Sequence, residues 1–335
     1  MRDRAWRVGM AGAGWVTQYH LPAWQNQAHR AEIVAIADPS DAALETRRQQ
    51  FGIAGGFTSA EAMLDADQLD IIDICAPAEA HPILVRLAAA RGVAVLCQKP
   101  LALSLAEAEA LVAGLPPTVP VMVHDNWRFR ATYRKIRTWL DAGVIGDIRR
   151  VQLDYLSSGM IPDASGNRPA LVRQPNFPTL GRLLVQEVMI HHLDTLRFLF
   201  GELDLVTATL ARSNDDIVGE DAATLTLSTR DGRTPVLLAG NLAVHGEPPQ
   251  ARDQLRIYGA KATVVLDGYR LTCIGETTIT EDFDPAATYQ GAYDSAIAHF
   301  LDGLESGGPF ETAPADNLKT LALVEAAYAL AEVHD

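Results

Sequence analysis

Residues 6–17, WRVGMAGAGWVT, decide the fold of this chain. The first half predicts a buried strand, and Gly12 and Gly14 follow where that strand would end. At such a position Gly12 permits a tight turn. Gly14 lets the backbone approach a pyrophosphate, which the N-terminus of the next helix attracts. The order of strand, glycine loop and helix therefore predicts a dinucleotide-binding unit.

A carboxylate at the end of the second strand-like run, AEIVAIAD, strengthens this prediction. Asp38 lies 26 residues beyond Gly12, the spacing expected of an acid that binds the adenosine ribose. Its charge would repel a 2′-phosphate, so NAD is favoured over NADP. The alternatives are a glycine turn that serves packing alone and an aspartate that caps the following helix. The expected cofactor contacts here are Gly12, Gly14, Trp15, Val16 and Asp38, and Thr17 stands where a third glycine or alanine is usual.

Short strand-like runs alternate with helix-like segments over the first 123 residues. Ser104 and Glu107 form a capping-box pattern before the helical run SLAEAEALVAG. Alternation of this kind is typical of a parallel, doubly wound sheet. We expect a Rossmann domain over residues 1–123.

The pattern changes after residue 124. One long helix is predicted over residues 182–201, and runs such as AATLTLST and PVLLAGNLAV then follow without helices between them. Asp231 and Gly232 form a hairpin signal between these two runs. We therefore expect an α/β protein whose second domain, residues 124–335, is a substrate-binding and oligomerisation α+β domain with a large, mostly antiparallel sheet. Helices near 289–305 and 314–333 are predicted to finish it.

Composition narrows the class of function. Forty-two acidic against 28 basic residues give a net charge of −14, which argues against a nucleic-acid partner. We find no run that is long and apolar enough for a membrane span or a secretory signal. The three cysteines form no CxxC pair. A cytoplasmic protein with a small-molecule partner is expected.

A lysine follows the predicted strand VAVLC, within the tripeptide Gln98-Lys99-Pro100. Residues just past the carboxyl ends of strands in a doubly wound sheet face the ligand crevice. Lys99 could there hydrogen-bond a reacting hydroxyl and stabilise alkoxide character. The alternative is an ordinary solvated lysine.

Glu187, His191 and Asp194 are spaced i, i+4, i+7 on the predicted long helix and would share one face. His191 suits proton abstraction near neutral pH, with Glu187 orienting it or holding a substrate hydroxyl. His192 points elsewhere and suits a structural part. A satisfied core histidine is the plain alternative for His191. A zinc site is the rival, but no HExxH or cysteine ligand set accompanies it, so no metal is expected.

Together these residues resemble the Gfo/Idh/MocA family of oxidoreductases over essentially the whole chain. The resemblance depends on the glycine loop, Asp38, APAEAH at 76–81, QKP at 98–100, NWRF at 126–129 and EVMIHHLD at 187–194. It implies that Lys99, Glu187 and His191 carry the chemistry beside nicotinamide. It further implies cofactor contacts from Ala76, Pro77, His81, Gln98, Lys99 and Asn126, and substrate contacts from Lys99, Asn126, Arg128, Glu187 and His191.

Three positions depart from the family pattern. Gln98 replaces a glutamate, Glu187 replaces an aspartate, and Met189 stands where glycine is common. The stretches QKP, HDNWRF, VRQPNF and VQEVMIHHLD are most similar to the branch whose members oxidise D-apiose. This similarity adds Arg173, Gln174 and Asn176, within the long irregular stretch 157–181, as substrate-facing candidates. A solvated polar loop is the alternative for these three residues.

The resemblance implies an NAD-dependent dehydrogenase that takes hydride from a hydroxyl or anomeric carbon of a small sugar or polyol. A D-apiose-like aldose is a candidate substrate. A homodimer or homotetramer is implied as well. Two other functions stay open: a non-catalytic NAD-binding regulator, and NAD-dependent glycoside cleavage.

Overall fold

The computed structural model describes residues 4–66 and 68–334. The chain forms two compact units. The first joins Met1–Phe129 to Tyr289–Leu321, and the second joins Arg130–Thr288 to Ala322–Asp335. The domain boundary predicted after residue 123 lies close to the first division, whereas the return of Tyr289–Leu321 to the first unit was not predicted.

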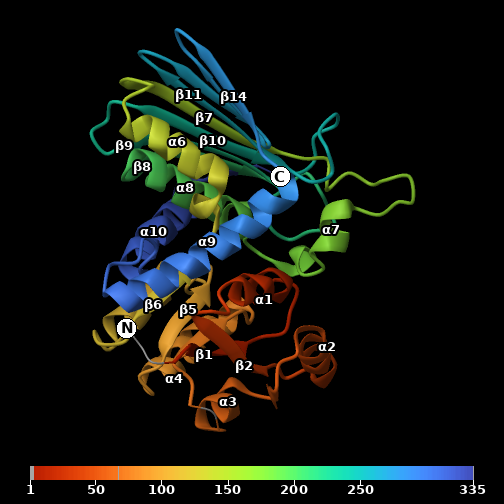
Figure 1. The fold of residues 1–335 in the computed structure, drawn as a ribbon. Helices are drawn as coiled ribbons and strands as arrows, with labels where there is room; N and C mark the ends of the chain where they lie inside the picture. The colour runs from red at the N-terminus through yellow and green to blue at the C-terminus, as the bar shows by residue number, and fades with distance from the viewer. Residues whose placement is uncertain (1–3, 67, 335) are drawn as a thin grey trace. The chain divides into compact units, whose positions relative to one another are not determined.

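The first unit contains a parallel sheet in the order β3-β2-β1-β4-β5-β6 among its described residues (Figure 1). The strand order reverses beside β1, so the carboxyl ends of β1 and β4 flank the switch point where ligands bind in such sheets. This confirms the predicted doubly wound fold. The strands are β1 Trp6–Ala11, β2 Ala31–Ala37, β3 Gly55–Phe57, β4 Ile71–Ile74, β5 Ala94–Gln98 and β6 Val121–His124. The α-helices are α1 Thr17–Asn26, α2 Asp41–Phe51, α3 Ala60–Ala66, α4 His81–Ala89 and α5 Leu105–Ala113, with short 3-10 turns η1 Ala78–Ala80 and η2 Trp127–Phe129.

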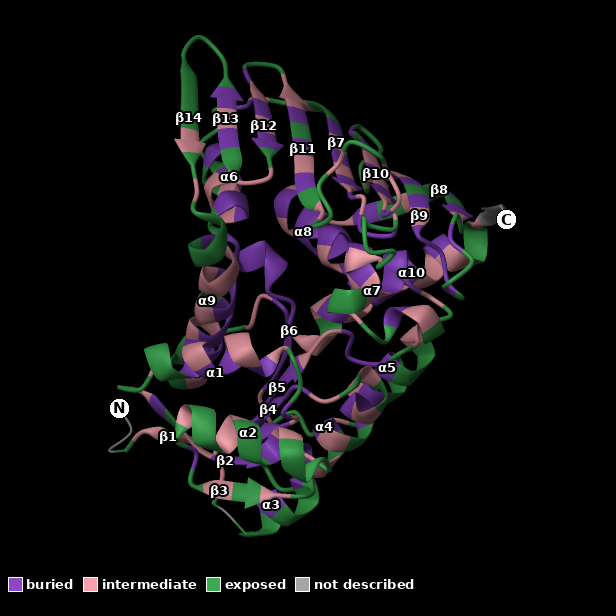
Figure 2. Cartoon of the chain, turned by 90° about the vertical axis from the view of Figure 1, so that its right-hand side faces the viewer, coloured by how far each residue is buried: buried purple, intermediate pink, exposed green. Residues whose placement is uncertain are grey.

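The core of this unit draws on both ends of the chain. Val8, Met10 and Leu96 of the central strands are fully buried, as expected for a sheet covered on both faces (Figure 2). Ile297 and Phe300 from α9 belong to the same hydrophobic cluster and are also fully buried. Helix α9 (Pro285–Ser306) is therefore a structural part of the nucleotide-binding unit from Tyr289 onward.

The second unit contains a sheet in the order β14-β13-β12-β11-β7-β10-β9-β8-β15 among its described residues. Its pairs are antiparallel except β7 with β10 and β8 with β15, so the prediction of a mostly antiparallel sheet is confirmed. Strands β7, β13 and β15 were not predicted, and the helix predicted to run to residue 333 ends at Leu330 because the chain then pairs with β8 as β15. The strands are β7 Ile148–Leu156, β8 Leu203–Ala211, β9 Ala222–Thr229, β10 Pro235–Asn241, β11 Arg252–Gly259, β12 Thr263–Asp267, β13 Arg270–Ile274, β14 Thr278–Asp282 and β15 Glu332–His334.

Buried and more exposed residues alternate along the strands of this second sheet. Leu225 and Leu227 of β9 pair with Leu238 and Val236 of β10 and are buried, while their neighbours along each strand are more exposed. This period of two is the mark of a half-buried sheet. The helices of the unit are α6 Ala131–Asp141, α7 Pro169–Arg173 and α8 Ile190–Phe200, with a 3-10 turn η3 Phe177–Thr179 and a π-helical segment η4 Leu184–Met189. Helix α10 (Pro314–Leu330), like α9, crosses the division between the units.

The single long α-helix predicted over residues 182–201 is wrong in its first half. Residues Leu184–Met189 are π-helical, and the α-helix α8 begins only at Ile190. A π-helical segment closes wider turns and rotates side chains away from α-helical spacing. Glu187 and His191 are half-buried, but Asp194 is fully buried, so the three do not present one common exposed face.

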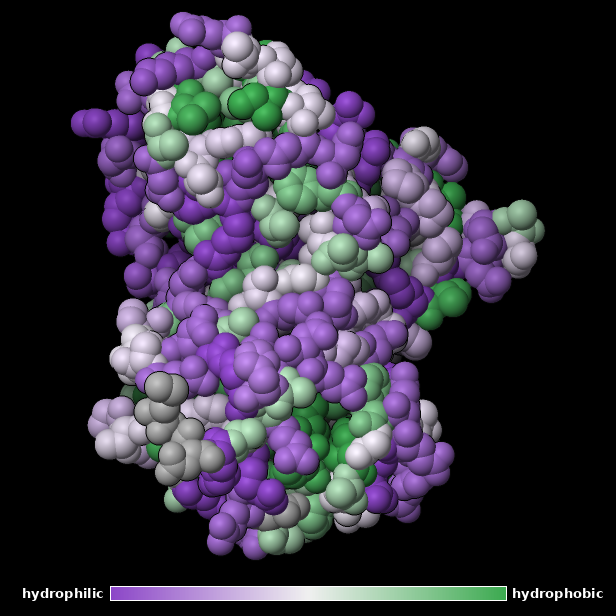
Figure 3. All heavy atoms as spheres, viewed as in Figure 1, coloured by the Kyte–Doolittle hydropathy of each residue, from purple (hydrophilic) through white to green (hydrophobic). Residues whose placement is uncertain are grey.

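Figure 3 shows one face of the molecule by hydropathy. The face drawn in Figure 3 is mostly hydrophilic, with smaller hydrophobic areas between. Among the helices of the described residues, none is long and apolar enough to cross a membrane.

Candidate cofactor and catalytic residues

The glycine loop after β1 has the geometry that dinucleotide binding requires. Gly12 has φ +109°, and a Cβ built there would lie 2.6 Å from the carbonyl oxygen of Cys75. A Cβ built on Gly14 meets nothing within 4 Å. Thr17 donates its hydroxyl to the Gly14 carbonyl at 2.6 Å, so the residue in the third glycine position holds the loop. The loop leaves Gly14 open to a ligand.

We expect alanine at Gly12 to lower the stability of the fold, and alanine at Gly14 to lower the affinity for NAD. G12A meets the β4 backbone at an unfavourable φ, so it should destabilise the protein by about 2 kcal/mol or more. G14A should unfold at the wild-type urea concentration yet bind NAD at least about tenfold more weakly, because a methyl group would fill the space over the loop. Urea unfolding and calorimetric NAD titration of both variants check this. A G14A protein with wild-type NAD affinity would contradict the cofactor assignment.

Asp38 is tied to this loop. Its Oδ2 accepts from the Ala13 amide at 2.7 Å, and its Oδ1 accepts from the Ser40 amide at 2.8 Å. Each carboxylate oxygen has a second lone pair, so the half-buried side chain can still accept from ribose hydroxyls. Asp38 therefore braces the glycine loop and keeps acceptor capacity for a cofactor. Trp15, predicted beside it, is 45% exposed, and Val16 is half-buried.

His81 joins the loops that follow β4 and β5. Its Nδ1 lies 2.7 Å from the carbonyl oxygen of Pro100, and its Nε2 lies 2.9 Å from that of Ala76. Burial lowers the pKa of His81, and the hydrogen bonds to the two carbonyls oppose that shift. His81 thus lies within hydrogen-bonding distance of both loops that carry predicted cofactor contacts, and its neutral ring donates to one of the two carbonyl oxygens at a time. Pro77 is exposed, Lys99 is half-buried, and the Lys99–Pro100 peptide is cis.

A cluster of potential metal ligands lies behind these loops. His20, Asp73 and Cys75 bring their ligand atoms within 4.8 Å of one another, and all three are buried. However, Asp73 Oδ2 accepts from the indole of Trp24 and from His20 at 2.7 Å each. Burial and Asp73 raise the pKa of the Cys75 thiol well above its ordinary value. A thiol and an engaged carboxylate describe a hydrogen-bonded network better than a metal site.

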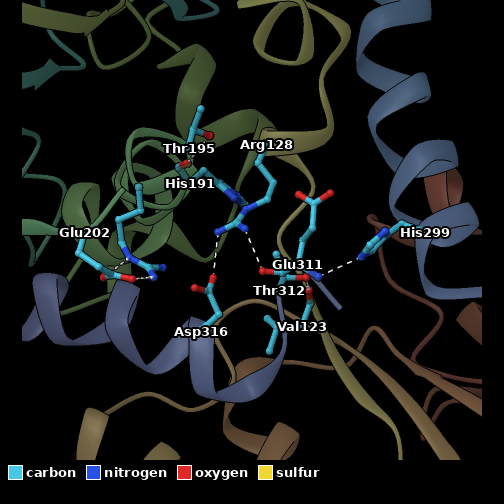
Figure 4. Close-up of polar contacts among 10 residues, drawn as sticks. Val123, Arg128, His191, Thr195, Glu202, His299, Glu311, Thr312 and Asp316 are labelled. Atoms are coloured by element: carbon cyan, nitrogen blue, oxygen red, sulfur yellow. Dashed lines mark hydrogen bonds and ion pairs between the residues drawn. The ribbon is translucent and has the colours of Figure 1, made fainter. Parts of the chain in front are cut away.

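Asn126 and Arg128 follow β6, as the NWRF stretch predicted. Both are buried, and Asn126 Nδ2 has no hydrogen-bond partner among the described residues. Arg128 donates to the Glu311 carbonyl at 2.9 Å and pairs with Asp316 at 3.0 Å (Figure 4). Arg128 is therefore anchored within the first unit, and a buried amide without a partner is the kind of group that a ligand satisfies.

The segment 311–317 was missed by the sequence predictions. The Thr312 hydroxyl donates to the Val123 carbonyl at 2.6 Å, and the Glu311 amide donates to His299 at 2.9 Å (Figure 4). Asn317 is buried with neither of its side-chain polar atoms hydrogen-bonded among the described residues. Nothing in the local pattern of α10 distinguishes Asn317. Only the return of this segment to the first unit shows its relation to β6.

The π-helical segment that carries Glu187 is capped by Glu220, which lies in the loop before β9. Glu220 Oε1 accepts from the Val185 amide at 2.9 Å and from the Tyr328 hydroxyl at 2.6 Å. Burial and the neighbouring Glu220 raise the pKa of Tyr328 well above its ordinary value. The carbonyl of His191 accepts from Thr195 one turn on (Figure 4). The predicted acid and base thus stand at the junction of a capped π-helical turn and a regular α-helix, and such turns are frequent at functional sites.

His192 has the structural part that was predicted for it. Its Nε2 lies 3.0 Å from Asp253 Oδ1, while Asp253 Oδ2 accepts from Arg130 at 2.9 Å and from Tyr133 at 2.7 Å. Burial alone would raise the pKa of Asp253, but His192, Arg130 and Tyr133 together hold it well below its ordinary value. This buried cluster ties α6 and α8 to β11.

The predicted substrate loop is partly helical. Arg173 ends α7 and is exposed, Gln174 is half-buried, and Asn176 is exposed. The prediction of a 25-residue irregular stretch is therefore corrected to two short helical turns, α7 and η3, joined by loops. Each of these turns has a proline at its first or second position, Pro169 in α7 and Pro178 in η3, where the missing N–H costs no helical hydrogen bond.

The first unit contains three groups that suit the binding of NAD. An open Gly14, the carboxylate of Asp38 and the unsatisfied amide of Asn126 all lie in loops at the carboxyl edge of the parallel sheet or just beyond it. The fold and these residues define a dinucleotide-binding oxidoreductase.

Known proteins identify the family. Residues 6–117 match the oxidoreductase family with NAD-binding Rossmann fold of the Gfo/Idh/MocA group, and residues 133–265 match the Gfo/Idh/MocA C-terminal domain. The chain belongs to the Gfo/Idh/MocA family and is an NAD-dependent oxidoreductase, as predicted from its sequence.

Individual relatives are similar over nearly the whole chain. D-apiose dehydrogenase of Paraburkholderia graminis is 35% identical over 97% of this chain and 87% of its own length. D-apiose dehydrogenase of Rhizobium rhizogenes is 32% identical over 95% and 93%. An oxidoreductase from Agrobacterium radiobacter, solved with NAD+, L-tartaric acid and magnesium, is 31% identical over 97% and 96%, with a TM-score of 0.89.

Proposed function

We propose that this protein oxidises a hydroxyl of a small sugar, with a D-apiose-like aldose as the first substrate to test. The observation that carries the proposal is the position of Lys99, directly after β5, on the carboxyl edge of the sheet that holds the glycine loop. The names of the two D-apiose dehydrogenases that span this chain support the substrate class.

Three side chains carry the chemistry in this proposal. Lys99 hydrogen-bonds the reacting hydroxyl and stabilises negative charge on its oxygen. His191 takes the hydroxyl proton, and Glu187 orients His191 or holds a neighbouring hydroxyl. Bound NAD would supply the hydride acceptor, and the substrate would leave as a carbonyl compound. The C–H electron pair and the O–H proton are thus both accounted for.

The remaining predicted contacts complete the proposal. Trp15, Val16, Ala76, Pro77, Gln98 and Asn126 contact the cofactor, and Asn126, Arg173 and Gln174 contact the sugar. Arg128 was also predicted to contact the sugar, but it is buried in an ion pair with Asp316, so we assign it instead to shaping the site through the segment 311–317. A cytoplasmic homodimer or homotetramer belongs to the same proposal.

The test is NADH formation with NAD and a panel of aldoses, inositols and other polyols, including D-apiose. We expect a strong signal with one aldose, and weak activity with NADP because the carboxylate of Asp38 would face the 2′-phosphate. NADP activity equal to NAD activity would contradict the role of Asp38. No signal with any sugar despite NAD binding would overturn the proposal in favour of a regulator. Release of an aglycone without NADH would indicate glycoside cleavage.

A further inference from the structure

Four consecutive backbone amides open the helical segment that carries Glu187 and leads to His191. The first four amides of a helix have no acceptor within it, so each needs one from elsewhere. Here two residues from later in the chain, Glu220 and Tyr328, supply all of them. The amides of Leu183 and Val185 donate to Glu220 Oε2 and Oε1 at 3.3 and 2.9 Å, that of Leu184 to the Glu220 carbonyl at 3.2 Å, and that of Gln186 to the Tyr328 hydroxyl at 3.3 Å.

Glu220 and Tyr328 are also hydrogen-bonded to each other. A backbone N–H can only donate, so the Tyr328 oxygen accepts from Gln186 and its one hydrogen goes to Glu220 Oε1, 2.6 Å away. Both side-chain oxygens of Glu220 accept from backbone amides, as an ionised carboxylate can. Glu220 is buried, so these contacts are shielded from water. The two side chains thus form one connected cap.

This cap is held by its own surroundings. The guanidinium of Arg182 lies 4.5 Å from the centre of the Tyr328 ring and pairs with Glu325 at 3.0 Å. The loop before β9 approaches the turn closely, since a Cβ built on Gly219 would lie 2.9 Å from the amide nitrogen of Leu183. By contrast, no side chain of the N-cap residue Leu183 caps the turn. The start of the turn is therefore fixed by two segments that are distant in the sequence.

The capped turn is π-helical, and this affects the relation between two predicted site residues. A π-helical turn holds about one residue more than an α-helical turn. Relaxation of residues 184–189 to an α-helix would turn Glu187 relative to His191 by about 100°, the angle between successive residues of an α-helix. We propose that Glu220 and Tyr328 are positioning residues, which keep Glu187 and His191 in the relative orientation that the reaction uses. This inference rests on the roles of Glu187 and His191 in the proposed function.

The first arm of the test needs no substrate. Amide hydrogen exchange over residues 183–187 is followed by mass spectrometry in the wild type, E220M and Y328F. Both variants leave amides of the turn without acceptors, so exchange should be at least about fivefold faster. D221N is the matched control, because the neighbouring Asp221 is fully buried and its carboxylate accepts from Ser213 instead of the turn. It should exchange at the wild-type rate over 183–187. Unchanged exchange in both E220M and Y328F would overturn the proposal.

The second arm measures kcat for an aldose that the sugar panel identifies. It should fall at least about tenfold in E220M and Y328F, because a displaced acid or base loses its productive geometry. NAD affinity should stay within about twofold, since the cap lies in the second unit and the glycine loop in the first. A merely structural role would lower thermal stability and leave kcat of the folded enzyme unchanged. E220Q keeps an oxygen for Val185 and Tyr328, so its kcat should stay within about threefold.

Glu220 and Tyr328 should act as a unit. The double variant of E220M and Y328F should therefore lose no more kcat than the more damaged single variant, whereas independent residues would give losses that multiply. Multiplying losses, or an unchanged kcat in folded E220M and Y328F, would overturn the positioning role. If E220M does not fold, Y328F, which removes only a hydroxyl, carries both arms. If no sugar is oxidised, the proposed function fails, and hydrogen exchange still decides whether the pair holds the turn.

Discussion

Replacing Lys99 by alanine should lower kcat for the sugar at least about a thousandfold, because the variant loses the group that stabilises charge on the reacting oxygen. NAD affinity should stay within about tenfold, roughly 1.4 kcal/mol, since the glycine loop and Asp38 are untouched. Steady-state NADH formation and calorimetric NAD titration measure the two quantities separately.

Lys135 supplies the matched control. Its ammonium pairs with Glu281 at 2.7 Å on the surface of the second unit, so K135A removes a lysine of the same size without touching a predicted site residue. It should keep kcat within about twofold, as expected for an exposed ion pair. Turnover retained in K99A would remove Lys99 from the chemistry. Equal losses in both variants would show that the assay reports folding and not catalysis.

Replacing Asp253 by asparagine should have the largest effect on stability, about 3 kcal/mol or more. Asp253 is 4% exposed and is the shared partner of Arg130, Tyr133 and His192. The neutral amide leaves the buried guanidinium without its counter-charge, and breaking a buried pair in this way costs about 3–5 kcal/mol. Urea unfolding at neutral pH gives the difference in free energy of unfolding.

The pH dependence of the same variant provides an independent check. Because the folded-state pKa of Asp253 is held below its unfolded value, its contribution is fully present above about pH 4 and declines as the pH falls further toward the folded-state pKa. The wild type should therefore lose stability relative to D253N on acidification. D204N, which removes a half-exposed partner of Arg230 at 3.9 Å, should change stability by less than about 0.5 kcal/mol. Equal acid sensitivity of wild type and D253N would contradict the role of the cluster.

The sequence was most informative where a local pattern has a single physical cause. One example is the start of the first unit, with β1, the glycine loop, β2 and Asp38. It was predicted because a tight glycine turn after one strand and a carboxylate after the next are typical of dinucleotide binding. The helix N-terminus predicted at Ser104 is also confirmed, since the Ser104 side chain accepts from the Glu107 amide at 3.3 Å and caps α5. These features depend on neighbours in the chain.

Features that depend on distant segments were missed. The π-helical turn before His191 is capped by Glu220, which lies in the later loop before β9, and no local sequence pattern predicts this contact. Gln98 contacts His20 on α1 and His124 on β6, so the local motif indicated the residue and not its contacts. Asn317 and Thr312 belong to the first unit only because the chain returns there.

The return of Tyr289–Leu321 to the first unit affects when that unit can fold during translation. Proteins synthesised from the N-terminus commonly fold their first domain while later residues are still being added. Here Ile297 and Phe300 fill the core beneath the first sheet, so a nascent chain that has reached only Phe129 still lacks part of its own interior. The nucleotide-binding unit can reach its final packing only when translation has passed Leu321, long after Phe129 has been added. The nucleotide-binding unit is completed only after strands β7–β14 of the second unit have been synthesised.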